Sequence, residues 1–283
     1  MKLSRRKLLQ GLGGFTLSGL IGACHIRWFE PYWLECTTKD IPIHQLDTKI
    51  KALHLSDFHA SDVMSLEAIE KAIDLGIEQK PDMIFLTGDY ITWGITNEQA
   101  YRKILSKLSE TAPTFACIGN HDGGLWAGSS HGYKDSTKVE ALLKSAGIHV
   151  LINQSERIQL AGRTIKVVGL GDLWSGLAMP GVVLEKQRSA DEVVVVLSHN
   201  PDSKTELQSF DWDLTLCGHT HGGQLVVPIL GLRPFLPVRD KTFPEGILSW
   251  ENRHIHITRG VGNLHDLRFN CRPEVSLLNL VKA

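Results

Sequence analysis

Five short apolar runs of this 283-residue chain each end in a cluster of Asp, Asn, Gly and His residues. The clusters are Asp57-Phe58-His59, Gly88-Asp89, Gly119-Asn120-His121-Asp122, His199-Asn200 and Gly218-His219-Thr220-His221. Apolar runs of this length are typical of buried strands, and side chains beyond the carboxyl ends of parallel strands gather at one edge of a sheet. The pattern therefore predicts an α/β fold whose loops carry a polar site.

The rest of the chain indicates one layered domain over residues 44–283. Strands are predicted over 51–56, 82–87, 114–118, 148–152, 165–170, 192–197, 214–217, 225–227, 254–258 and 275–281, and helices over 66–79, 97–109 and 136–146. Helices alternate with strands in the first half, and strands dominate the second. We therefore expect two facing mixed sheets with helices outside them, around one core.

Residues 1–43 are predicted to be a twin-arginine-type signal or N-terminal membrane segment. Arg5-Arg6 precede an uncharged stretch over residues 8–24, the pattern of an export signal. Aromatic residues over 28–33 follow this stretch and suit a membrane interface. We expect export by the Tat machinery to the periplasm or to the outer face of the cytoplasmic membrane. Cleavage of the signal, lipidation at Cys24 and retention as an anchor stay open as alternatives.

Charge and cysteine content restrict the class of protein. The net charge is −1, and without the six basic and three acidic residues of 1–43 it is −4, so a nucleic-acid partner is not expected. The five Cys form no close pairs, which excludes a zinc-ribbon pattern. Cys117 and Cys217, on apolar strands, are predicted to be buried free thiols. A Cys36–Cys271 disulfide stays open as an alternative.

The clusters offer carboxylate, imidazole and amide donors but no thiolate, a set that suits Mn, Fe or Zn in a catalytic site. Asp57 and His59 are spaced i and i+2, as are His219 and His221, so each pair can point to one side. Any one cluster has a simpler reading as a turn, a helix cap or a buried histidine. Together they provide enough donors for two divalent ions, and a pair of ions is the usual device for phosphoester hydrolysis.

The ordered clusters resemble the five motifs of the calcineurin-like metallophosphoesterases, from about residue 50 to 281. The resemblance implies a four-layer αββα sandwich and hydrolysis of phosphodiester or pyrophosphate bonds by a metal-bridged hydroxide. It assigns Asp57, His59 and His221 to the first metal and Asn120, His199 and His219 to the second, with Asp89 bridging them. His121 would contact the phosphate and protonate the leaving group, and Asp122 would orient His121. Two divalent ions (Mn, Zn or Fe) are expected, with Mn favoured for activity.

The sequence departs from the family pattern at positions that indicate the class of substrate. Protein phosphatases of this superfamily carry arginines in the second and third motifs, whereas residues 88–94 read Gly-Asp-Tyr-Ile-Thr-Trp-Gly here. A small phosphodiester is therefore expected over a dianionic monoester. The apolar stretch 225–238 is either a packed loop or a lipid contact. A lipid-linked substrate such as a UDP-2,3-diacylglucosamine, cleaved at its pyrophosphate, and a non-catalytic metal-binding scaffold are the alternatives.

Overall fold

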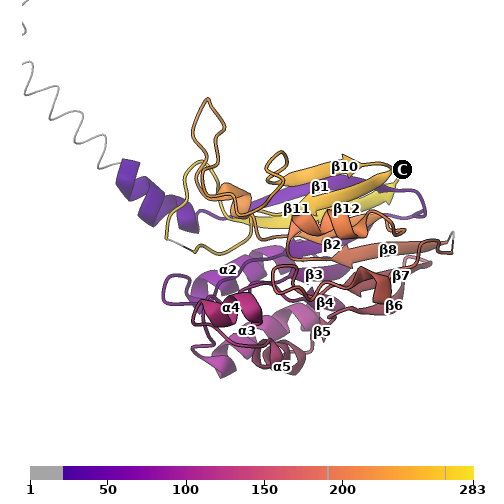
Figure 1. Cartoon of the computed structure of the whole chain (residues 1–283), viewed down its shortest axis with the longest axis horizontal. Helices are drawn as coiled ribbons and strands as arrows, with labels where there is room; N and C mark the ends of the chain where they lie inside the picture. Colours follow the sequence, from indigo (N-terminus) through magenta and orange to yellow (C-terminus); the bar gives the residue numbers. More distant parts are fainter. Residues whose placement is uncertain (1–21, 190, 265) are drawn as a thin grey trace, which may run out of the picture.

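The computed structural model describes residues 22–189, 191–264 and 266–283, and two six-stranded sheets face each other within it (Figure 1). The first sheet has the order β1-β12-β2-β3-β4-β5 and the second β10-β11-β9-β8-β7-β6. Each sheet mixes parallel and antiparallel pairs: β2, β3, β4 and β5 run parallel, as do β7, β8, β9 and β11, while β12–β2, β6–β7 and β10–β11 are antiparallel. The predicted α/β class with two mixed sheets and flanking helices is confirmed.

The strands are β1 Glu35–Ile43, β2 Ile50–Leu55, β3 Met83–Thr87, β4 Thr114–Cys117, β5 His149–Val150, β6 Gln154–Leu160, β7 Arg163–Gly169, β8 Glu192–Leu197, β9 Leu214–Cys217, β10 Gly246–Trp250, β11 Arg253–Ile257 and β12 Glu274–Lys282. The α-helices are α2 Leu66–Ile77, α3 Glu98–Thr111, α4 Leu125–Ser129, α5 Thr137–Ser145 and α6 Lys204–Leu207. The predicted helices over 66–79, 97–109 and 136–146 correspond to α2, α3 and α5.

Alternating side chains of the central strands join the layers. On β3, Met83 and Phe85 pack between the sheets, whereas Ile84 and Leu86 pack against the helices. Both faces are covered, so every residue of β3 is buried, as expected of a central parallel strand. The helices α2, α3 and α5 cover the first sheet, and α6 with loops covers the second (Figure 1).

Helix α2 shows how local sequence starts and places an element. The side chain of Ser65 accepts a hydrogen bond from the backbone N–H of Ala68, which caps the first turn. Ile69, Ala72 and Ile73 then recur on one face and are buried against the first sheet. The helix ends at Ile77, two residues before the predicted end.

Several strands differ from the sequence prediction. β1 lies within the segment 1–43 assigned to export, yet it pairs along its whole length with β12, so these residues are part of the first sheet. The sequence does not predict the edge strands β6 and β10. β6 is mostly polar, with exposed and half-buried residues, and β10 has no fully buried residue, so neither reads as a buried apolar run. The predicted strand 225–227 is wrong: only an isolated bridge joins Leu225 to Phe269.

The N-terminal signal prediction falls largely outside the described residues, including Arg5-Arg6. In the part of the chain that the structure describes, no helix has both the length and the apolar character needed to cross a membrane. All five cysteines are free thiols, and Cys117 and Cys217 are buried as predicted. The alternative of a Cys36–Cys271 disulfide is therefore wrong for this structure.

Candidate metal centre

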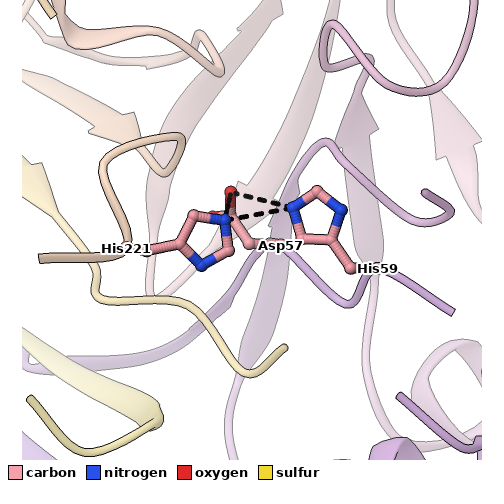
Figure 2. Close-up of side chains that lie close together, drawn as sticks. All are labelled: Asp57, His59 and His221. Carbon is pink, nitrogen blue, oxygen red and sulfur yellow. Dashed lines mark hydrogen bonds and ion pairs between the residues drawn. The ribbon is translucent and has the colours of Figure 1, made fainter. Parts of the chain in front are cut away.

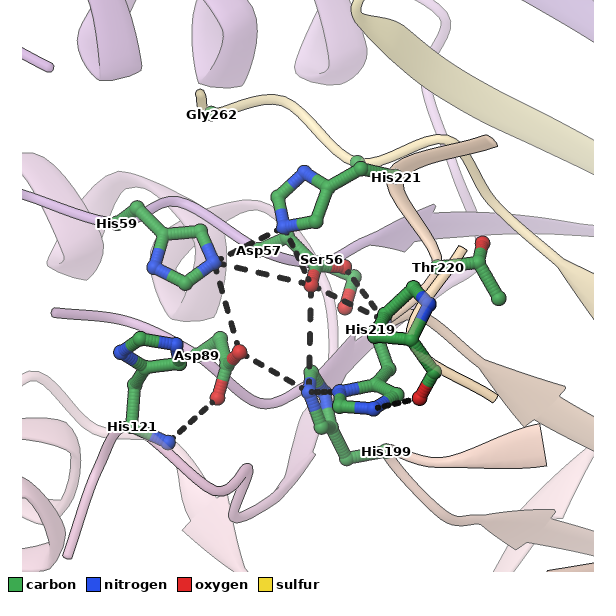
Figure 3. A network of polar contacts seen from close by, with 12 residues as sticks. Ser56, Asp57, His59, Asp89, His121, His199, His219, Thr220, His221 and Gly262 are labelled. Carbon is green, nitrogen blue, oxygen red and sulfur yellow. Dashed lines mark hydrogen bonds and ion pairs between the residues drawn. The ribbon is translucent and has the colours of Figure 1, made fainter. Parts of the chain in front are cut away.

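The five clusters come together where strands of both sheets end. Asp57 and Asp89 follow the parallel neighbours β2 and β3, and Asn120 follows β4. His199 and His219 follow β8 and β9, a parallel pair of the second sheet. Figure 3 shows the side chains from the two sheets converging on one point. The fold thus joins donors that lie up to 164 residues apart in the sequence.

The backbone at the site is unusual. Five of the seven predicted ligands have positive φ, with values of 55° for Asp57, 49° for His59, 56° for Asp89, 67° for His219 and 49° for His221. Few residues other than glycine adopt this region, and such conformations concentrate at functional sites. The surrounding fold therefore holds these side chains in a conformation that a free loop would avoid.

Glycines of the motifs make room for the carboxylates. A Cβ atom on Gly218 would overlap the carboxylate of Asp57, and one on Gly119 would overlap the carboxylate of Asp89. Any side chain at these positions would displace a predicted ligand. Gly119 therefore permits close packing of two neighbouring loops of the first sheet, and Gly218 permits close packing between loops of the two sheets.

The first cluster contains Asp57, His59 and His221, the residues assigned to the first metal (Figure 2). The Nε2 atoms of His59 and His221 lie 3.0 Å apart. Asp57 Oδ1 lies 3.4 Å from His221 Nε2 and 3.9 Å from His59 Nε2. All three side chains are buried. Two imidazole nitrogens and one carboxylate oxygen thus converge on a common point.

The second cluster contains Asp89, His199 and His219. His199 Nε2 lies 3.0 Å from Asp89 Oδ2 and 3.2 Å from His219 Nδ1. Asp89 Oδ2 is also 3.4 Å from His59 Nε2, so one carboxylate oxygen reaches both clusters. This is the position that a bridging ligand requires.

Asn120 completes the set of predicted ligands. Its side chain is buried, and its Oδ1 atom has no hydrogen-bond partner among the described residues. A buried amide oxygen without a partner costs free energy unless a cation or a water molecule fills the gap. The orphaned oxygen is consistent with a metal ligand.

Backbone carbonyls fix the tautomers of two site histidines. His199 Nδ1 donates to the carbonyl of Thr87 over 2.6 Å, which leaves Nε2 facing Asp89. His219 Nε2 donates to the carbonyl of Pro237 over 3.2 Å, which leaves Nδ1 facing the second cluster. A hydrogen bond from the outer nitrogen is the usual way in which proteins orient a metal-binding imidazole.

The electrostatics of the metal-free chain also favour a cation. Burial raises the pKa of Asp57 to about 6. Burial opposes protonation of His199, but the adjacent Asp89 carboxylate outweighs it and raises the pKa of His199 to about 10. Burial lowers the pKa of His219 to about 3. Asp57 and Asp89 pair with histidines and with no Lys or Arg of the described segments, so a divalent ion would take the place of the proton that Asp89 holds on His199.

His121 forms a third group of close donor atoms with His59 and Asp89, although it is outside the predicted ligand set. Its backbone N–H donates to Asp89 Oδ1 over 2.9 Å, and its ring lies 4.7 Å from that of His59. Its Nδ1 donates to the carbonyl of Thr92 over 3.0 Å, which leaves Nε2 available for a substrate oxygen. This geometry suits proton donation by His121.

The predicted contact between Asp122 and the His121 ring is absent among the described contacts. The Asp122 carboxylate instead accepts backbone N–H groups of Asp89, Tyr90 and Gly119, at 2.7–2.8 Å. The turn closed by the hydrogen bond from Asp122 N to Gly119 O directs the side chain toward the β3 loop. Asp122 therefore positions the backbone around Asp89, and Thr92 takes the orienting role.

Arg268 supports the site from outside the five motifs, and the sequence does not predict this role. It is fully buried, and its guanidinium donates to the carbonyls of Arg259, Gly260, Gly262 and Cys271. The segment 260–262 in turn packs on Asp57, with Gly262 N donating to Asp57 O over 2.6 Å. No sequence signal distinguishes this arginine from a surface one.

Comparison with known proteins places these features in context. The model of the calcineurin-like phosphoesterase family matches residues 50–223. Phosphodiesterase YaeI of Escherichia coli (strain K12) is 44% identical over 281 residues, covering 99% of this chain and all of that protein. The uncharacterized metallophosphoesterase YkuE of Bacillus subtilis (strain 168) is 32% identical, covering 99% of this chain and 98% of that protein. UDP-2,3-diacylglucosamine pyrophosphatase LpxG of Chlamydia trachomatis is 24% identical, covering 81% of this chain and 83% of that protein.

Proposed function

The chain belongs to the calcineurin-like phosphoesterase family, and from this premise we propose that it is a phosphodiesterase that uses two divalent metal ions. The observation that carries the proposal is the pair of clusters that share Asp89 Oδ2. Asp57, His59 and His221 would hold one ion, and Asn120, His199 and His219 the other. When bound, two such ions supply an activated water molecule and neutralise phosphate oxygens.

The protein's own groups complete the reaction. With both ring nitrogens protonated, His121 would donate the Nε2 proton to the leaving oxygen and become neutral, while the Thr92 carbonyl accepts from its Nδ1 and holds the ring in orientation. The Asp122 carboxylate would keep the Asp89 loop in place through its backbone hydrogen bonds.

The site favours a diester over a monoester as substrate, because no arginine of the motifs is present to bind a second negative charge. Trp93 occupies the position where the protein phosphatases of the superfamily carry an arginine, and its ring lies 5.7 Å from that of His121. The Arg268 guanidinium is engaged by backbone carbonyls. The second and third motifs thus supply no arginine for a dianionic phosphate, whereas a monoanionic diester needs less positive charge.

The test is metal-dependent hydrolysis of bis-p-nitrophenyl phosphate by protein stripped of metal and reloaded with Mn, Zn or Fe. We expect about two ions per chain by elemental analysis, the highest turnover with Mn, and faster cleavage of the diester than of p-nitrophenyl phosphate. His149→Asn, at an exposed position paired with Glu156, is the matched control and should behave as wild type. Folded protein without activity in every metal would refute the proposal.

A lipid-linked phosphodiester or pyrophosphate is the second candidate, since two exposed apolar segments lie close together. Ile229, Leu230 and Phe235 of one loop are exposed, as are Trp28 and Phe29 of the N-terminal segment. A surface cavity is lined by Trp33 and Pro228, from the two segments, which lie side by side in Figure 1. Exposed apolar patches mark contacts with membranes or with other proteins, and a membrane contact would bring a lipid-linked substrate to the site.

The lipid candidate is tested with vesicles of phosphatidylethanolamine and phosphatidylglycerol. Wild-type protein should sediment with the vesicles, and the double variant Ile229→Ser with Leu230→Ser should remain in solution with unchanged turnover of a soluble diester. Equal sedimentation of both proteins would contradict a membrane contact at this loop. Loss of UDP-2,3-diacylglucosamine from a lipid extract would then identify the substrate class.

We also propose export by the Tat machinery, which the Arg5-Arg6 pair supports. The protein would act in the periplasm or at the outer face of the cytoplasmic membrane. Replacement of both arginines by lysine should keep the protein in the cytoplasmic fraction of cells, while Lys2→Arg should not. Unchanged export of the double-lysine variant would contradict the proposal.

A further inference from the structure

Three tryptophans form an arc beside the metal centre. The Trp93 ring lies 5.7 Å from that of His121, which lies 4.4 Å from Trp126. Trp126 lies 5.6 Å from Trp174, whose ring is perpendicular to that of His219 at 4.4 Å. The arc therefore runs from the proposed proton donor to a ligand of the second metal, and it joins loops of both sheets.

Trp174 is exposed and yet held in place. The residue is 40% exposed, an unusual state for a tryptophan that touches a buried site. The turn that carries it is fixed by the buried carboxylate of Asp172, which accepts from Trp174 N over 3.3 Å and Ser175 N over 2.7 Å. The indole thus stands at the site before any ligand binds, which lowers the entropic cost of binding.

A cavity of about 380 Å³ opens on the side of Trp174, a volume typical of small-molecule sites. Most of its other lining residues are charged: Asp202, Lys204, Glu206, Arg239 and Asp240. Lys204 is paired with Asp240, whereas Arg239 has no ion-pair partner in the described segments. The cavity thus combines one aromatic wall, polar surroundings and a free guanidinium.

We propose that Trp174 and this cavity form the subsite for a nucleoside group esterified to the reacting phosphate, with the base stacked on the indole. The inference rests on the proposed function, because the phosphate is placed by the metal centre. A planar base with polar edges and a hydroxylated sugar matches an aromatic wall among charged groups. An alkyl chain would need a continuous apolar lining, which this cavity lacks.

Calorimetric binding of two product-like ligands to the metal-loaded protein tests the subsite. Adenosine 5′-monophosphate and ribose 5-phosphate share the phosphate and the sugar and differ in the base alone. We expect wild-type protein to bind the nucleotide about tenfold more tightly, the effect of one base stacking on an indole. Trp174→Leu should remove this preference and leave the affinity for ribose 5-phosphate within about twofold.

Trp250→Leu is the matched control. Trp250 pairs with Arg253, at the end of the second sheet opposite to Cys217 and the site, so its replacement should keep the tenfold preference. Equal affinities in wild type, or a preference retained in Trp174→Leu, would overturn the subsite. A loss of octyl phosphate binding in place of nucleotide binding would also overturn it, in favour of an alkyl chain. Binding is measured without turnover, so an inactive protein would refute the proposed function and leave this test intact.

Discussion

Two groups of buried histidines lie in this molecule, one inside the strands and one in the loops beyond their ends. Inside the strands, His54 Nδ1 lies 2.9 Å from His256 Nδ1, and His54 Nε2 lies 2.8 Å from Thr87 Oγ1. In the loops, the Nε2 atoms of His59 and His221 face each other across 3.0 Å, beside buried carboxylates. Protein partners complete the first group, whereas the second concentrates ligand atoms around a point that a cation would fill.

The two groups of histidines also differ in backbone conformation. His54 and His256 have the extended conformation of β2 and β11, where neighbouring strands satisfy the main chain. His59, His219 and His221 have positive φ, which only the packing around them can maintain. Burial of a histidine therefore says little about function, while a strained position beyond a strand end says much.

The largest expected effect comes from the carboxylate that joins the two clusters. Asp89→Asn should lower kcat/KM for a diester by more than about 10³-fold, because a neutral amide cannot bridge two cations as a carboxylate does. Elemental analysis should show fewer than two ions per chain. His256→Asn, from the other histidine group, should keep its metal content and activity within about threefold. An active Asp89→Asn variant would show that the loop cluster around Asp89 is no more important for catalysis than the histidine pair inside the strands.

His121→Asn tests the proton donor with the ligand set intact. We expect kcat to fall by about 10²- to 10³-fold with both ions retained, the usual contribution of general acid catalysis. The loss should be smaller for a diester whose leaving group is a weak base, since that leaving oxygen needs no proton. Equal losses for strongly and weakly basic leaving groups would show that His121 serves another purpose.

Asp122→Asn distinguishes a backbone role from a role in orienting His121. An amide cannot accept from three N–H groups as the carboxylate does, so the Asp89 loop should shift and kcat should fall by about tenfold. The pH dependence of kcat should keep its shape, because the Thr92 carbonyl still holds His121. A shifted pH profile would instead support the predicted role of Asp122 in orienting His121.

The sequence predicts the residues of the site better than it predicts the contacts and strands that hold them in place. The five motifs were recognisable because each joins an apolar run to metal-binding side chains, and the sheets bring Asp57, Asp89, His199 and His219 together. The partner of Asp122 was not predictable, since it depends on how one turn closes. β1 was missed because its exposed Thr-Lys-Asp segment pairs with a strand more than 230 residues away, and no local pattern encodes such a pairing.

The smallest effect tests the histidine pair by pH. Burial lowers the pKa of His256 to about 4 and that of His54 well below its usual range, whereas an unfolded histidine titrates near pH 6.5. Between about pH 6.5 and 4 the unfolded chain therefore binds more protons. As the pH is lowered through this window, the free energy of unfolding should therefore decrease, by about 1.4 kcal/mol per pH unit for each histidine.

Replacement of one member isolates its share of this dependence. In metal-free protein, where the site histidines titrate alike in both chains, His256→Asn should reduce the slope by about 1.4 kcal/mol per pH unit. An asparagine at this position can still hydrogen-bond to His54, so the stability at pH 8 should fall by only about 1 kcal/mol. Urea denaturation at several pH values measures both quantities. An unchanged slope would show that His256 does not contribute to this pH dependence. A lower metal content of His256→Asn after reloading with metal would then move His256 from the structural pair into the metal centre.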